Sequence, residues 1–115
     1  LDCAKKKNSV GIEVLAPGNC ESLSKGSAYT VRWSVPQRAV GKKFNIRLKI
    51  GAAAPLIAGD LPVAGISGSF VWTPPSDGLI RNGYVSYRLD QQVYSISVMD
   101  TDTAFFGHSG LFYIR

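Results

Sequence analysis

The sequence has little of what most enzymes and metal proteins place at their sites. It contains one histidine and two cysteines among 115 residues, too few for the usual structural zinc site with four cysteine or histidine ligands. No apolar run approaches the ~20 residues that a membrane-spanning helix needs. Helical periodicity is almost absent as well. These absences argue against a zinc module, a chain with a membrane span and a helical bundle.

The composition nevertheless supports a hydrophobic core. Hydrophobic residues make up 45% of the chain and aromatic residues 10%, a composition unlike that of disordered or low-complexity segments. A chain of 115 residues is long enough for one domain and too short for two. We therefore expect residues 1–115 to form a single domain.

Short stretches of alternating hydrophobicity recur between turn signals and predict β-strands. The clearest, KFNIRLKI at 43–50, places four apolar side chains on one face and Asn45, Arg47 and Lys49 on the other, as in a half-buried antiparallel strand. Further strands are predicted at 10–17, 28–35, 54–65 (two short pieces), 68–75, 93–100 and 109–115. About seven strands with such spacing predict an all-β fold, an antiparallel β-sandwich of the immunoglobulin or fibronectin III type.

The two tryptophans are the main candidates for the space between the sheets, because large aromatic side chains bury the most area. We expect Trp33 and Trp72 to lie on facing or neighbouring strands. The full predicted core is Val14, Tyr29, Val31, Trp33, Ile46, Leu48, Phe70, Trp72, Tyr94, Ile96, Val98 and Phe112.

The cysteines, Cys3 and Cys20, both lie in the first fifth of the chain. An even cysteine count in a small, loop-rich domain favours a disulfide and an oxidising compartment. The alternative is a pair of unpaired thiols in a cytosolic protein. We predict the disulfide, which would attach the basic N-terminus (Lys5, Lys6 and Lys7) to the first turn.

Residues 74–92 form a long connection that contains a hairpin signal. Asn82-Gly83 is typical of a hairpin turn and is flanked by strand-like residues on both sides. A protruding hairpin at 79–88 would present side chains of the kinds found in binding hot spots, namely Arg81, Tyr84, Tyr87 and Arg88. We predict a binding surface there, together with Arg47 and Lys49 of the neighbouring sheet face. The alternative is an edge hairpin that caps one sheet.

The other candidates for chemistry are sparse. Asp100 and Asp102 alternate as some calcium ligands do, but the acidic series stops at two, and the alternative is that Asp100 ends its strand through turn hydrogen bonds. His108 and Ser109 are adjacent, so on a strand they would point to opposite faces, which disfavours a nucleophile–base pair. We predict no catalytic residues, no cofactor and no enzymatic activity.

The net charge of +5 would suit an acidic protein, an anionic wall polymer, lipid headgroups or nucleic acid, or would simply keep the domain soluble. Against specific nucleic-acid binding, the sequence has no recognition helix, aromatic stacking motif or zinc module.

The order of the motifs resembles a widespread extracellular module. VLAPG (14–18), GSAYTVRW (26–33), FNIRL (44–48), GSFVWTP (68–74), YSISVMD (94–100) and SGLFYI (109–114) follow one another as in the Ser/Thr-rich GPI-anchored, yeast cell-wall-synthesis type domain, which also occurs on bacterial surface proteins. The resemblance covers about 12–114. Cys20 stands where a second glycine is common, Leu23 replaces an aromatic residue, and 74–92 is longer than usual.

The resemblance implies an immunoglobulin-like fold and a non-catalytic module of the cell surface or envelope, secreted or extracellular, that binds a protein or a surface glycan. Two alternatives remain at this stage. One is a structural spacer within a larger surface protein, and the other is a carbohydrate-binding accessory domain of a secreted hydrolase. Short, mostly hydrophobic motifs specify a fold better than a ligand.

Overall fold

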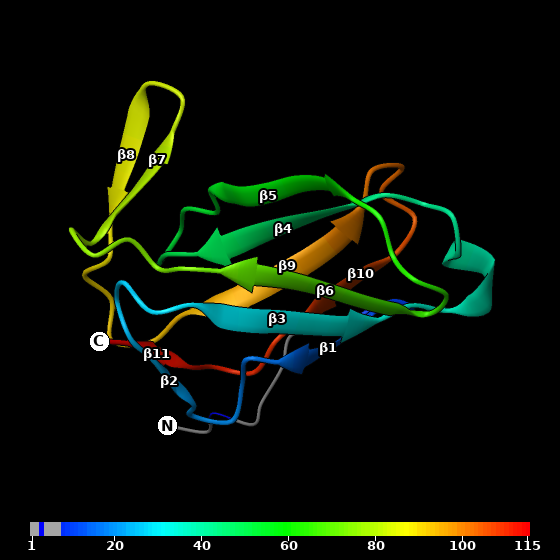
Figure 1. The fold of residues 1–115 in the computed structure, drawn as a ribbon, viewed down its shortest axis with the longest axis horizontal. Helices are drawn as coiled ribbons and strands as arrows, with labels where there is room; N and C mark the ends of the chain where they lie inside the picture. Colours follow the sequence, from blue (N-terminus) through cyan, green and yellow to red (C-terminus); the bar gives the residue numbers. More distant parts are fainter. Residues whose placement is uncertain (1–2, 4–7) are drawn as a thin grey trace.

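The computed structural model describes Cys3 and residues 8–115, which form an all-β structure (Figure 1). The strands are β1 (Glu13–Ala16), β2 (Ser22–Leu23), β3 (Tyr29–Ser34), β4 (Phe44–Lys49), β5 (Leu56–Leu61), β6 (Ser67–Trp72), β7 (Leu79–Asn82), β8 (Val85–Arg88), β9 (Ser95–Asp100), β10 (Phe106–His108) and β11 (Tyr113–Ile114). A single 3₁₀ turn, η1 (Gln37–Ala39), is the only helical element in these residues. The predicted lysine cluster, Lys5 to Lys7, lies outside the described residues.

Most of the strands belong to two antiparallel sheets. One has the order β1-β3-β6 and the other β10-β9-β4-β5. A short parallel pair, β2 with β11, and the separate β7–β8 hairpin complete the structure. Two sheets that share one core are consistent with the predicted β-sandwich. The strands outnumber the predicted seven because four more are present: β10 adds an edge to the four-stranded sheet, β2 pairs with β11, and β7 and β8 form the hairpin.

The core lies between the two sheets and is close to the one predicted. Ten of the twelve predicted core residues are buried, while Tyr29 and Phe70 are partly buried and pack against the same cluster. Trp33 lies on β3 and Trp72 on the adjacent β6, so the predicted placement on neighbouring strands is confirmed. The alternating pattern of β4 is confirmed too, because Phe44, Ile46 and Leu48 are all fully buried.

Trp33 depends on a glycine for its place in the core. In the β3–β6 ladder Trp33 lies opposite Gly68, and a Cβ added to Gly68 would overlap the indole Cε2 and lie 2.5 Å from Cζ2. The indole is fully buried and tilted against the ring of Phe44, with 6.4 Å between ring centroids. Its N–H has no hydrogen-bond partner among the described residues. Shape, rather than hydrogen bonding, therefore fixes this side chain.

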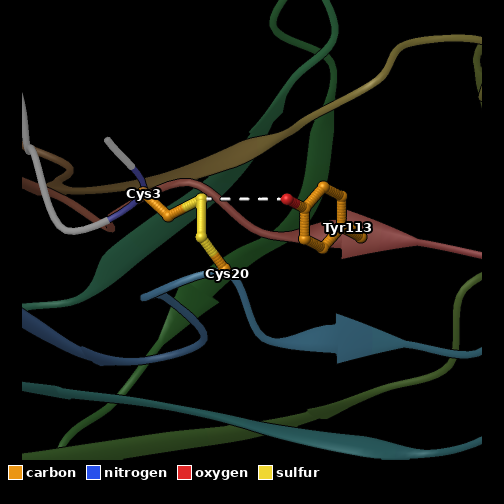
Figure 2. The surroundings of a disulfide bond; sticks show 3 residues. All are labelled: Cys3, Cys20 and Tyr113. Carbon is orange, nitrogen blue, oxygen red and sulfur yellow. Dashed lines mark hydrogen bonds between the residues drawn. A yellow bond between two sulfur atoms is a disulfide. The ribbon is translucent and has the colours of Figure 1, made fainter. Parts of the chain in front are cut away.

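The predicted disulfide between Cys3 and Cys20 is present (Figure 2), with 5.1 Å between the two Cα atoms. The Tyr113 hydroxyl on β11 donates toward the Cys3 Sγ across 3.9 Å. The backbone of Leu111 bonds to both halves: its N–H donates to the Cys3 carbonyl and its carbonyl accepts from the Cys20 N–H, each at 2.9 Å. The disulfide thus joins Cys3 to the first turn, and the hydrogen bonds of Leu111 connect both to the segment that leads into β11.

Candidate functional site

The predicted hairpin exists and its tip is one residue further along the chain than expected. β7 and β8 pair from Leu79 with Arg88 to Asn82 with Val85. This register leaves Gly83 and Tyr84 as the two turn residues, so the prediction of Asn82-Gly83 as the turn was wrong by one position. Gly83 has a φ of +64°, and a glycine with positive φ at the first turn position is typical of the type II′ hairpin.

Local contacts fix the base of the hairpin. The Leu89 N–H donates to the Gly78 carbonyl at 2.8 Å, and the Leu79 N–H donates to Asp77 Oδ1 at 3.1 Å. The other oxygen of Asp77 forms an ion pair with the Arg81 guanidinium at 2.6 Å. This pairing lowers the pKa of Asp77 and raises that of Arg81. Arg81 is therefore already engaged in an intramolecular ion pair at the base of the hairpin.

The four predicted binding residues of the hairpin all lie on β7, β8 or the turn between them, but their surroundings differ. Tyr84 sits at the tip and is fully exposed. Tyr87 lies opposite Ile80, which is buried, and packs against the core. Arg81 and Arg88 share the other face, because Leu79 pairs with Arg88 and side chains alternate along each strand. Tyr84 is the freest of the four for contact with a partner, whereas Tyr87 is largely a packing residue.

A groove of about 170 Å³ lies beside the hairpin. It is lined by Leu56 and Ile57 of β5, Trp72 of β6, and Pro75, Ile80 and Arg81 from the hairpin and the segment before it. Figure 1 shows the hairpin standing out beyond the sheets at this end of the molecule. The groove is not predictable from the sequence, since Leu56 and Ile57 come from a proline-interrupted segment with no clear alternation.

Arg47 and Lys49 do not join the hairpin in one cavity. Both lie on the outer face of the four-stranded sheet, opposite Ser97 and Ser95 of β9. Lys49 lines a hollow of about 240 Å³ with Gln91 and others, and Arg47 lines another of about 140 Å³. The Arg47 guanidinium also donates to the Ala54 carbonyl at 2.9 Å. The six predicted binding residues therefore fall into three separate places.

The carboxylates of Asp100 and Asp102 bind a lysine. Lys42 Nζ lies 2.8 Å from Asp102 Oδ2 and 3.5 Å from Asp100 Oδ2, and this pairing raises the pKa of Lys42. Asp100 is buried and its other oxygen accepts from the Phe105 N–H at 2.8 Å. Among the described residues no group of three potential metal ligands occurs. The arrangement matches the alternative in which Asp100 ends its strand by a turn hydrogen bond.

We expect Asp100→Ala to lower the free energy of unfolding by about 1–3 kcal/mol, because it removes the acceptor of a buried backbone N–H. The matched variant Asp102→Ala removes only an exposed ion pair and should cost about 0–1 kcal/mol. Urea denaturation of both variants measures the difference. Equal effects of the two changes, or stabilisation of the wild type by millimolar calcium, would contradict this assignment.

His108 and Ser109 make different kinds of contact. The buried Ser109 hydroxyl accepts from the Ile96 N–H at 2.8 Å and donates to the Gly110 carbonyl at 2.7 Å. The His108 ring instead packs edge-on against Phe106, with 5.9 Å between ring centroids. Both side chains thus have packing or turn-stabilising contacts, and the hairpin with its groove remains the strongest candidate site.

A scan against protein-family models finds no matching family, and a search of curated proteins finds no matching relative. In the described part of the chain, no helix has the length and apolar character to cross a membrane.

Proposed function

We propose that this chain is a non-catalytic, exported module of the cell surface or envelope that binds a protein or a surface glycan through the β7–β8 hairpin and the adjacent groove. The observation that carries the proposal is Tyr84, a fully exposed aromatic residue at the tip of a hairpin that projects beyond both sheets. An aromatic side chain offers a large contact area at a small cost in rotamer entropy, so it suits protein contacts and sugar stacking alike.

The fold that we propose is immunoglobulin-like, and two features support it. Some strands that neighbour each other in space are far apart in the chain, as β3 is beside β6 and β4 is beside β9, which is typical of Greek-key sandwiches. Tyr94, just before β9, is buried and its hydroxyl accepts from the Gln91 N–H at 3.0 Å. Such a tyrosine corner recurs in immunoglobulin-like domains. The motif order that resembles the Ser/Thr-rich GPI-anchored, yeast cell-wall-synthesis type domain agrees with this proposal.

The proposed location outside the cytoplasm has one main support. Disulfides persist in oxidising compartments, and the Cys3–Cys20 bridge closes the N-terminal part of the domain. The net charge of +5 would also favour association with the anionic polymers and proteins of a cell envelope.

The test uses two sets of probes: insoluble peptidoglycan, β-glucan and chitin, and a library of displayed peptides. We expect the folded domain to retain at least one set. Tyr84→Ala should weaken that binding about 30-fold, the loss associated with truncation of a hot-spot residue. The control is Leu15→Ala, which truncates another exposed apolar residue (51% exposed) on β1 and should bind like the wild type.

Circular dichroism must first establish that both variants keep the β-sheet spectrum of the wild type. A folded domain that retains neither set of probes would favour the structural spacer. Unchanged binding of Tyr84→Ala would remove the hairpin tip from the interface.

A further inference from the structure

The two sheets have four outer edges, and three of them are protected against additional strands. β10 is covered by Val10, whose N–H and carbonyl both bond to Phe106 at 2.8 and 3.0 Å. β1 is short and has a register shift after Val14. β5 has two register shifts along β4, and its Asp60 has a φ of +54°. Short strands, bulges and charged residues are common means of preventing edge-to-edge pairing.

The fourth edge, β6, is covered only at its first residue, where Ser67 bonds to Ala64. It pairs with β3 over six consecutive residues without a register shift, and it contains neither proline nor a charged residue. No described strand lies on its other side. A regular edge strand of this kind can accept a further strand through its backbone.

The hydrogen-bond register identifies the free backbone groups. The Val35 N–H donates to the Ile66 carbonyl. Every second residue pair of the β3–β6 ladder, counted from this one to Tyr29 with Trp72, is therefore hydrogen-bonded between the two strands. The backbone groups of Ser67, Ser69 and Val71 therefore point away from β3. Ser67 is already bonded to Ala64 in both directions, at 3.0 and 3.1 Å. Ser69 and Val71 remain available for an added strand.

The core is also less covered on this side of the molecule. Several apolar side chains of β5, of β6 and of the connection between them are only partly buried against the core, namely Ile57 and Leu61 of β5, Phe70 of β6, and Val63. Val71 is 62% exposed and Ile66 is 50% exposed. The groove beside the hairpin lies between the same two strands, because Leu56, Ile57 and Trp72 line it. A strand added to β6 would extend the three-stranded sheet over these side chains.

The absence of charged residues around β6 indicates which kind of ligand this strand could bind. Residues 61–76 contain no charged side chain, although the whole chain carries a net charge of +5. A polymer that is recognised by its charge would find no partner along this strand. A polypeptide backbone would find two sets of hydrogen-bonding groups and an apolar surface beneath them, which are the two requirements of recognition by strand addition.

We infer that β6 is the docking strand for an extended segment of a partner protein, one in which apolar residues alternate with polar ones. The segment pairs with Ser69 and Val71, turns its apolar side chains toward Phe70 and Leu61, and continues into the groove beside the hairpin. The inference rests on the proposed function in one respect: it takes the partner to be a protein rather than a glycan.

The experiment selects ten-residue peptides from a displayed random library on the folded domain and measures amide hydrogen exchange with a synthetic peptide from that selection. We expect enriched sequences to alternate between apolar and polar residues. Saturation with the peptide should slow exchange at the Ser69 and Val71 amides about tenfold or more, since each gains a hydrogen bond that exchange must break. This readout needs no variant and is therefore insensitive to folding defects.

Two substitutions at one position supply the matched comparison. Ser69→Pro removes an N–H that faces solvent rather than β3, a place where a strand tolerates proline, and should weaken peptide binding about tenfold. Ser69→Ala keeps the N–H and should bind like the wild type.

Three results would overturn the inference. They are a selection without enriched peptides, a bound peptide that leaves Ser69 and Val71 exchange unchanged, and a concentration-dependent dimer that protects the same amides by itself, which would assign the edge to a second copy.

Tyr84→Ala separates this inference from the proposed function. Glycan binding that depends on Tyr84 without any peptide binding would leave the proposed function standing alone. Peptide binding at β6 that is unaffected by Tyr84→Ala would support this inference and remove the hairpin tip from the proposed interface.

Discussion

Gly68→Ala is expected to destabilise the domain by about 3 kcal/mol, the upper part of the usual range for overpacking a core. The added Cβ would overlap the six-membered ring of Trp33. The indole has little room to move, because it is fully buried and packs against Phe44. Urea denaturation followed by tryptophan fluorescence measures the loss, with Ser69→Ala, the next residue on the exposed face of β6, as the control.

A double-mutant cycle tests the cause of this loss. Trp33→Leu alone should cost about 2–5 kcal/mol, because leucine fills only part of the space and leaves a cavity. In the combined variant, the alanine at position 68 would occupy part of that cavity. The free energy lost by the combined variant should therefore be smaller than the sum of the two single losses. Strict additivity, or a Gly68→Ala protein as stable as the wild type, would show that Trp33 is not held by this contact.

Removal of the disulfide is expected to lower the free energy of unfolding by about 3 kcal/mol, as the chain-entropy model gives for a loop of this size. Cys3 and Cys20 are 17 positions apart. The variant Cys3→Ala with Cys20→Ala should keep the β-sheet spectrum and unfold at lower urea. Intact mass after alkylation without reductant checks the wild type first, and two alkylated thiols in protein produced in an oxidising compartment would exclude the bridge.

A second version of this variant separates the loss of the bridge from a backbone effect. Cys20 has a φ of +64°, a conformation that costs most residues about 1 kcal/mol and glycine little. Cys3→Ala with Cys20→Gly should therefore be more stable than the double-alanine variant. If glycine is no better there, the positive φ at Cys20 does not persist once the bridge is absent.

Local patterns in the sequence predicted the regular part of this fold. The alternation in β4 identified its buried face correctly, and the even cysteine count identified the bridge. Contacts between distant segments could not be predicted in this way. The groove brings Leu56 beside Ile80, and the ion pair joins Lys42 to Asp102. In neither case does the sequence around one residue indicate that the other lies close to it. The hairpin turn was misplaced by one residue because Asn-Gly and a glycine followed by another residue both favour tight hairpins, and only the strand register distinguishes them.

The site was predicted less well than the fold for a related reason. Tyr84 and Tyr87 look equivalent in the sequence, and each is an aromatic residue in a polar hairpin. The pairing of Tyr87 with buried Ile80 assigns it to packing, while the turn leaves Tyr84 exposed. Similarly, the uncharged stretch that contains β6 is visible in the sequence, but its position at the edge of a sheet follows only from the strand order.

The parallel pairing of β2 with β11 also determines how the domain would bear tension. Pulling on the two ends of the chain would transmit force from Cys3 through the disulfide directly to Cys20, and from there into β2, so that β1 would lie outside the loaded path. The opposing force would enter β11 from its C-terminal end. Because β2 and β11 run in the same direction, the load would act along the strands, and their hydrogen bonds would have to break together rather than one after another. Reduction of the disulfide would place β1 in the path, so the bridge governs mechanical resistance as well as stability.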